Sequence, residues 1–250
     1  MPFTPAHVAI VTPFLRSRRL SAIALIIGSM APDFEYFFKF KVNSHFSHTM
    51  VGLFIFDLPV TYGLAFIFLT IVRNNLISNL PIFLQLKLQE VWTIDIRETL
   101  LNRWPIFIAS ALLGAASHIF WDAFTHNNTI FTSNLSIYKG TYVPYEGVKY
   151  PLWYALQHIS TGIGLLIVTV YILVQKPKGI IRLNVPKLWY WMFLIIFIGI
   201  TVWVRFAIEP SAWKEGNVVV TFISGLCIGV VLCGVINFDN PILNPHQQDG

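Results

Sequence analysis

The stretch LWYWMFLIIFIGITVWVRFAI, residues 188–208, decides the fold. Its one charged residue is Arg205, and its length of about 20 residues is what an α-helix needs to cross the hydrocarbon core of a membrane. Four more apolar stretches of similar length lie at about 50–72, 105–124, 153–174 and 217–236. The sequence therefore predicts an all-α, polytopic helical membrane protein with about five full spans.

The composition agrees with this class. Of the 250 residues, 55% are hydrophobic and 12% are charged, whereas soluble domains carry about 25% charged residues. Mean hydropathy is +0.64. These values exclude a disordered protein, a coiled coil and an ordinary soluble enzyme. We expect a single membrane-embedded helical domain over residues 1–240 and a polar C-terminal tail at 241–250.

Basic residues gather on one side of the predicted topology. That side carries Arg16, Arg18, Arg19, Arg73, Lys87, Arg97, Arg103, Lys176, Lys178, Arg182 and Lys187, and the other carries Lys39, Lys41, Lys139, Lys149 and Lys214. The positive-inside rule places the first set in the cytoplasm, so we expect a multi-pass protein of the cell (inner) membrane. Because no basic stripe interleaves with aromatic residues, we expect membrane lipid as a partner and no nucleic acid.

Shorter segments flank the spans. Two apolar runs at 6–15 and 21–31 are too short to cross a membrane, and we expect a hairpin of two short helices that brings His7 and Asp33 to the same end. Residues 80–101 mix apolar and charged side chains, which predicts an amphipathic interfacial helix. A loop with one or two helical turns is the alternative. Residues 127–152 are expected to form a polar loop.

The strongest candidate site is HIFWDAFTH, residues 118–126. Residues four apart on a helix share one face, so His118, Asp122 and His126 form a stripe whose adjacent members can reach one metal ion. His118 and His126 lie roughly 12 Å apart along an unbroken helix, so they can bind one ion together only if the helix breaks first. A structural polar network, in which Asp122 hydrogen-bonds a histidine, is the alternative.

Two other segments carry candidate ligands. In NSHFSHT, residues 43–49, His45 and His48 are three apart, and neighbours on a helical turn can ligate one ion. In GSMAPDFEY, residues 28–36, Pro32 ends the preceding helix, so Asp33 projects as a ligand, a bridge or a cap of the next turn. We expect Glu35 to be a solvated interfacial charge.

The remaining polar residues have less definite roles. His158 lies near the outer end of its predicted span and could face the same cavity, whereas His246 in the tail has no expected role. Asp57 lies within the first span, near the kink expected at Pro59. It could pair with Arg205 or serve proton or ion transport. Cys227 and Cys233 point to different faces of one helix, so we expect neither a disulfide nor a metal pair.

The order of motifs resembles that of a bacterial integral membrane family of unknown function, 4184. The motifs are MPFTPAH (1–7), GSMAPDFEY (28–36), SHTMVGL (47–53) and SH…WD…TH (117–126). More distantly, the same order is similar to the membrane-bound metal-dependent hydrolase group, and its His-x-x-x-Asp element is similar to zinc-dependent phospholipase C. This resemblance implies Zn²⁺ or another divalent metal held by His7, Asp33, His48, His118 and Asp122. It also implies that His45 and His126 are ligands or acid–base groups.

These observations predict a divalent-metal-dependent hydrolase acting on a phosphoester or lipid-linked substrate at the extracytoplasmic face, where the candidate histidines and aspartates converge. A non-enzymatic transporter or scaffold with a buried His/Asp network is the first alternative. A metal-binding sensor or chaperone subunit is the second.

Overall fold

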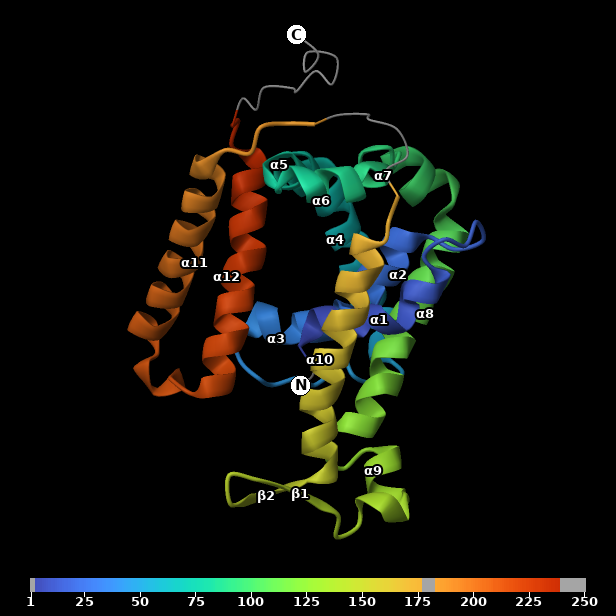
Figure 1. Ribbon diagram of the computed structural model, residues 1–250, viewed down its shortest axis with the longest axis vertical. Helices are drawn as coiled ribbons and strands as arrows, with labels where there is room; N and C mark the ends of the chain where they lie inside the picture. Colours follow the sequence, from blue (N-terminus) through green and yellow to red (C-terminus); the bar gives the residue numbers. More distant parts are fainter. Residues whose placement is uncertain (1–2, 177–182, 239–250) are drawn as a thin grey trace. The chain divides into compact units, whose positions relative to one another are not determined.

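The computed structural model describes residues 3–176 and 183–238 (Figure 1). Within them, five helical segments are long and apolar enough to cross a membrane. They are Leu53–Asn79, Trp104–Asn134, Leu152–Leu173, Leu188–Ile208 and Glu215–Val235. The predicted all-α, multi-pass membrane class is therefore confirmed. The predicted tail at 241–250, which includes His246, lies outside the described residues.

The chain forms two compact units. The first comprises the described residues up to Asp33 together with His45–Tyr62 and Arg103–Tyr171. The second comprises Phe34–Ser44, Gly63–Asn102 and the described residues from Ile172 onward. That residues 1–240 form a single domain stays a prediction.

The first unit begins with the predicted hairpin of short helices. The elements are a 3-10 helix at Thr4–His7, α1 at Val8–Val11, a second 3-10 helix at Thr12–Phe14, and α2 at Ala22–Gly28. Val8, Val11 and Leu25 form a small apolar core between them. The hairpin prediction is confirmed, and it brings the residues around His7 close to a further 3-10 helix at Ala31–Asp33.

The hairpin packs against α8, Trp104–Thr125, at very short range. A Cβ atom on Gly28 would lie 2.5 Å from the carbonyl oxygen of Ala111, and one on Gly114 would lie 2.6 Å from that of Leu25. Both positions require glycine, because any larger residue would push the two helix backbones apart. This close approach matters for the site, since α2 leads to Ser29 and α8 carries His118.

The first long apolar helix is not regular. A π-helical turn at Leu53–Asp57 precedes α4, Leu58–Ile67, and a second π-helical turn at Phe68–Val72 precedes α5, Arg73–Asn79. Wide turns of this kind are frequent at functional sites and at helix distortions. The irregularity expected near Pro59 thus occurs in the residues directly before it.

The loop between the second and third spans is more ordered than its composition predicts. It contains α9 at Ile130–Asn134, a 3-10 helix at Ser136–Tyr138, and a hairpin of β1, Tyr142–Tyr145, and β2, Val148–Pro151. Glu146 and Gly147 connect the strands with φ of 47° and 79°, which is the backbone of a type I′ turn. The hairpin leads directly into α10, Leu152–Leu173, and lies at the lower end of that helix in Figure 1.

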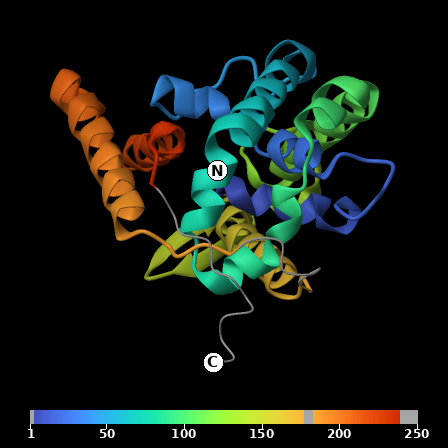
Figure 2. The same ribbon diagram turned by 90° about the horizontal axis from the view of Figure 1, so that it is seen from above.

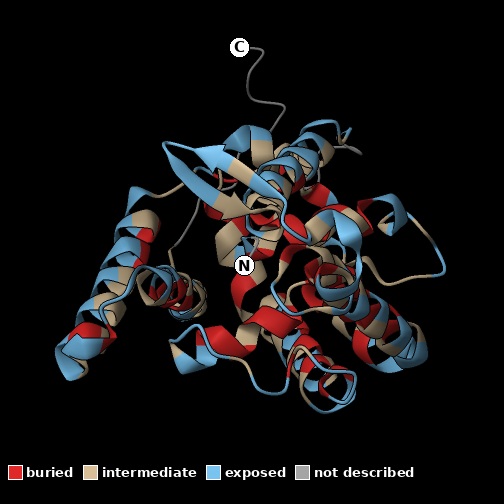
Figure 3. Cartoon of the chain, turned by 90° about the horizontal axis from the view of Figure 1, so that it is seen from below, coloured by how far each residue is buried: buried red, intermediate tan, exposed pale blue. Residues whose placement is uncertain are grey.

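The second unit is built around two long helices, α11 at Leu188–Ile208 and α12 at Glu215–Val235, which lie side by side (Figure 2). A 3-10 helix at Pro210–Ala212 connects them. Tyr190, Leu194 and Cys233 form their common core, and both cysteines are free thiols. Most of the α11 surface is exposed or half-buried (Figure 3), as expected of an apolar helix that faces lipid.

Short helices complete the second unit. They are α3 at Phe34–Lys39, α6 at Ile82–Lys87, α7 at Gln89–Trp92 and a π-helical turn at Glu98–Asn102. The prediction of one amphipathic helix over 80–101 is wrong, because the helix breaks at Leu88 and again after Trp92. Gln85 turns inward, where its amide donates to the carbonyl oxygens of Ser78, Leu80 and Asn184.

Glu35 also differs from its prediction. It is 3% exposed and forms an ion pair with Lys39, one turn further along α3, so it is not a solvated charge. The pairing offsets the cost of removing the carboxylate from water.

Candidate metal centre

Helix α8 supplies the centre of the site. His118 and Asp122 lie one turn apart on its buried face, with His118 Nε2 3.3 Å from Asp122 Oδ2. The predicted His118–Asp122 pair is therefore present. At the other end of α8, Arg103 donates to the carbonyl oxygen of Arg18, so the basic end and the His/Asp end of this unit are separated by the length of the helix.

The close contact of α2 with α8 sets the orientation of His118. Its Nδ1 lies 2.8 Å from the backbone carbonyl oxygen of Ser29. Because a carbonyl oxygen can only accept, Nδ1 carries a proton, and Nε2 is the ring nitrogen that a cation could bind once it is unprotonated. A backbone carbonyl that fixes the second ring nitrogen is the usual support of a metal-ligating histidine.

The N-terminal hairpin supplies His7 and Asp33. The His7 ring stacks on the His118 ring, with centroids 3.7 Å apart and 16° between the planes. Thr4 donates to Asp33 Oδ2 at 2.6 Å, which holds the carboxylate so that Oδ1 faces His118 Nε2 at 3.6 Å. Both residues contact His118, so the prediction that His7 and Asp33 lie at the same end of the hairpin is confirmed.

The turn before the first long helix supplies His48 but not His45. His48 Nε2 lies 3.7 Å from Asp33 Oδ1 and 3.6 Å from Asp122 Oδ2. Residues 43–49 form turns instead of a helix, so the two histidines do not act as a helical pair. His45 is exposed and does not belong to the described groups whose ligand atoms lie within 4.8 Å of one another.

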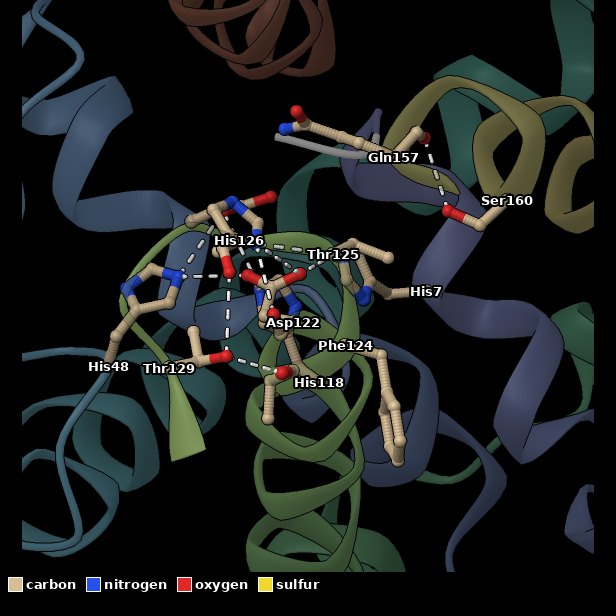
Figure 4. Close-up of polar contacts among 12 residues, drawn as sticks. His7, His48, His118, Asp122, Phe124, Thr125, His126, Thr129, Gln157 and Ser160 are labelled. Atoms are coloured by element: carbon tan, nitrogen blue, oxygen red, sulfur yellow. Dashed lines mark hydrogen bonds and ion pairs between the residues drawn. The ribbon is translucent and has the colours of Figure 1, made fainter. Parts of the chain in front are cut away.

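Four of these side chains form a closed ring of possible ligand atoms, which we call the four-ligand ring. In order around it come His118 Nε2, Asp33 Oδ1, His48 Nε2 and Asp122 Oδ2, with neighbouring atoms 3.3–3.7 Å apart. Nitrogen and oxygen alternate, and Figure 4 shows His48 and His118 directed toward Asp122.

The distances between neighbouring atoms of the ring are compatible with a bound cation. Hydrogen bonds between nitrogen and oxygen are usually 2.7–3.2 Å long. Two tetrahedral ligands of Zn²⁺, each at about 2.05 Å, lie about 3.3 Å apart. Among the described buried atoms that make no hydrogen bond are Asp33 Oδ1, His118 Nε2 and both carboxylate oxygens of Asp122. Such buried atoms are costly unless something binds them.

The electrostatics of the hairpin residues favour ligation. Burial lowers the pKa of His7 well below its usual value, and the neighbouring His118 lowers it further, so His7 is neutral and able to ligate. Burial raises the pKa of Asp33. A divalent cation beside this carboxylate would stabilise its ionised form.

The site is open on one side. The side chains of His7 and His118 are 0% exposed, whereas those of His48 and His126 are 21% and 28% exposed. Helix α8 breaks after Thr125, where His126 is extended with φ −118° and ψ 151°. The Nδ1 of His126 lies 3.5 Å from Oδ1 of Asp122, one turn earlier in the chain. That His118 and His126 bind one ion together stays a prediction, since His126 is in neither of the described ligand groups that contain His118.

The turn after α8 fixes this break. Thr132 Oγ1 donates to the backbone carbonyl oxygen of His126 at 2.8 Å, and Thr129 caps α9 by accepting from the Thr132 amide. His158, by contrast, is exposed on α10 and packs edge-on against Tyr154, with ring centroids 4.6 Å apart. It is absent from the described ligand groups.

Three supporting residues could not be identified from the sequence as parts of the site. They are Thr4, Ser29 and Ser47, the last lying 2.9 Å from His48 Nδ1. Thr4 and Ser47 do occur inside the motifs quoted above, so their positions gave a weak signal. Ser29 contributes only its backbone carbonyl, and no side-chain pattern could reveal that contact.

The fold and this cluster together define a polytopic membrane protein with a buried His/Asp centre. The chain belongs to the family DUF4184, a domain of unknown function, which matches residues 1–235. No curated protein and no solved structure matches the chain. The resemblance to the hydrolase groups stays a prediction.

Proposed function

We propose that this protein is a divalent-metal-dependent hydrolase that cleaves a phosphoester of a lipid or lipid-linked substrate at the extracytoplasmic face of the cell (inner) membrane. The observation that carries the proposal is the four-ligand ring of His118, Asp33, His48 and Asp122. Two buried carboxylates that face two buried or half-buried imidazoles are costly in a membrane protein, and such groups usually serve a function.

The donor set agrees with Zn²⁺ or a similar ion. Imidazole nitrogen and carboxylate oxygen are both common zinc ligands. Because the ring already offers four ligand atoms, water would bind the ion as a fifth ligand, an expansion that catalytic zinc sites undergo. A divalent ion held by these residues would lower the pKa of a water molecule toward 7 and polarise the phosphoryl oxygen. The open side, bordered by His48 and His126, is where water and substrate would enter.

His126 is the better placed of the two candidate acid–base groups. Its Nδ1 lies 3.2 Å from the carbonyl oxygen of Asp122, which can only accept, so Nδ1 carries a proton and Nε2 has the lone pair. Nε2 would take a proton from the attacking water as the new oxygen–phosphorus bond forms. The same proton would pass to the leaving alcohol oxygen as the ester bond breaks. Water is the one co-reactant. His45 was the other candidate, but it lies outside the cluster.

The surroundings of the open side favour an amphipathic substrate. Phe46 and Met50, on either side of His48, are 67% and 74% exposed. Phe54 and Ile55, on the first turn of the following span, are also exposed. A lipid with its acyl chains against these residues would place its headgroup ester at the depth of His48.

Metal analysis of purified protein tests the proposal. We expect wild-type protein in detergent to retain a divalent metal and to hydrolyse a fluorescent phospholipid. The double variant His118→Ala, Asp122→Ala should retain none and be inactive. His158→Ala, which replaces an exposed histidine outside the cluster, is the matched control. Equal metal content in wild type and double variant would refute the proposal. Metal-free wild-type protein with a pH-dependent ion flux in liposomes would favour a transporter instead.

A further inference from the structure

The four-ligand ring leaves one buried imidazole without a role. His7 is 1% exposed, and neither of its ring nitrogens makes a hydrogen bond within the described structure. Its ring stacks on that of His118 and meets that of Trp121 edge-on, and its nearest polar neighbour is one oxygen of Asp122, 3.5 Å from Nε2. Burying a polar side chain in this way is costly unless a ligand completes its coordination.

The two oxygens of Asp122 face different partners. Oδ2 belongs to the ring and faces His118 and His48, whereas Oδ1 faces His7 Nε2 at 3.5 Å. The protonated Nδ1 of His126 also lies 3.5 Å from Oδ1 but is not a ligand atom. A carboxylate with ligand atoms beside each oxygen is the arrangement that bridges two cations. In two-metal sites such cations lie about 3.5–4 Å apart.

The available atoms also favour two positions over one. The ligand atoms of His7, His118 and Asp122 lie within 4.8 Å of one another, and those of Asp33, His48 and His118 form a separate group of the same kind. His118 can contribute only Nε2, since its Nδ1 is bonded to Ser29. Because that Nε2 already belongs to the ring, the atoms left for a second position are His7 Nε2 and Asp122 Oδ1.

We infer that a second divalent cation binds between His7 Nε2 and Asp122 Oδ1, with Asp122 bridging it to the ion of the four-ligand ring. Only two side chains anchor this second ion, so it binds more weakly than the first and keeps several exchangeable positions. Those positions lie toward His126, on the open side. They suit water and the anionic oxygens of a phosphate group.

A second ion site is consistent with the contacts that fix the segment around His7. The short 3-10 helix at Thr4–His7 is fixed through the Thr4–Asp33 hydrogen bond, and the amide of Phe3 donates to Thr161 Oγ1 on α10. The same segment packs directly against the backbone of Gly164, where a Cβ would lie 2.7 Å from the carbonyl oxygen of Ala6. The segment that carries His7 is thus anchored from both sides.

The inference rests on the proposed function, because it places the second ion beside the first. Its test is a Mn²⁺ titration of metal-depleted full-length protein in detergent, followed by metal counting and electron paramagnetic resonance, with inorganic phosphate as the probe for the open positions. We expect two ions per chain, a spin-coupled Mn²⁺ pair, and a signal that changes on addition of phosphate.

His7→Ala should then retain one ion and show the uncoupled signal of an isolated Mn²⁺, whereas His158→Ala should behave as wild type. The coupled wild-type signal tests the inference even if His7→Ala does not fold. A single ion in wild type, or two ions retained by His7→Ala, would overturn the second site and leave the proposed function standing. No bound ion in wild type would overturn both.

Discussion

The polar side chains inside the two units of this protein have different kinds of partner. In the second unit, amide side chains satisfy backbone groups: the half-buried Asn75 donates to the carbonyl oxygens of Cys233, Gly234 and Ile236 at the end of α12. In the first unit, the buried imidazoles and carboxylates face one another at 3.3–3.7 Å and make few hydrogen bonds. The amides of the second unit bond to backbone, whereas in the first unit at least one polar atom of His7, His118, Asp33 and Asp122 faces other ionisable groups without a hydrogen bond, and this difference motivates the proposed ligand site.

Removal of Asp122 should have the largest effect of the variants considered, a loss of metal affinity in the first unit. Asp122→Ala deletes the residue that contacts His7, His48, His118 and His126. Loss of a supporting residue alone usually lowers metal affinity about 10–100-fold, so loss of this ligand should exceed that range. Titration with a competing chelator measures the change. A variant that binds metal as tightly as wild type would remove Asp122 from the site.

A methyl group at Gly114 tests whether helix contact supports the site. A Cβ there would lie 2.6 Å from the carbonyl oxygen of Leu25 and 2.8 Å from the amide of Ser29. We expect Gly114→Ala to lower the free energy of unfolding by about 1–3 kcal/mol and to weaken metal binding, because it displaces the partner of His118. Gly162→Ala is the control, since a Cβ at that position would meet no described atom within 4 Å. Thermal unfolding of both variants in detergent provides the measurement, and equal midpoints would contradict the argument.

The corresponding variant of the second unit should affect stability alone. Asn75→Leu leaves three backbone carbonyl oxygens without their donor, which should cost about 1–3 kcal/mol. Metal content should stay at the wild-type value. If the variant lost its metal, the separation between structural and ligand-type polar groups would be wrong.

The hydrogen bond from Thr4 to Asp33 offers a finer test. Thr4→Val keeps the shape of the side chain and removes the donor, so Asp33 should still bind but less firmly. We expect metal affinity to fall about 10-fold with little change in thermal stability. Thr4→Ser should restore the affinity, and its failure to do so would argue against the hydrogen bond as the cause.

The smallest effect concerns pH. Because burial lowers the pKa of His7 in the folded protein, the unfolded chain binds the extra proton first as pH falls below the ordinary histidine value of about 6.5. The metal-free protein should therefore lose stability below that pH. His7→Gln should make the midpoint less sensitive to acid in the same range. Thermal melts of both proteins between about pH 5 and 7.5 test this prediction, and equal acid sensitivity of the two midpoints would contradict it.

Much of this molecule can be predicted from periodicity and length. The five long apolar helices and the N-terminal hairpin follow from the number of residues needed to cross lipid, and the His118–Asp122 pair follows from helical spacing. Contacts between distant segments cannot be predicted in this way. The selection of His48 over His45 depends on a turn without helical spacing, and the orientation of His118 depends on a backbone carbonyl.

The short elements could not be predicted for a related reason. The β1–β2 hairpin depends on two residues with positive φ. The first of them is Glu146, and glutamate is not among the residues that indicate a type I′ turn. Gln85 and Gln89 look like surface residues of an amphipathic helix, yet both are buried. Tertiary hydrogen bonds decide such positions, and the local pattern does not contain them.

The order of the ligands along the chain has a consequence for biosynthesis. His7, Asp33, His48, His118, Asp122 and His126 all precede residue 127, so they come from the N-terminal segments and the first two of the five long helices. The ribosome has therefore delivered the complete donor set while α10, α11 and α12 are still untranslated. If the proposed function holds, ion capture would accompany insertion of the early helices and precede synthesis of the later ones.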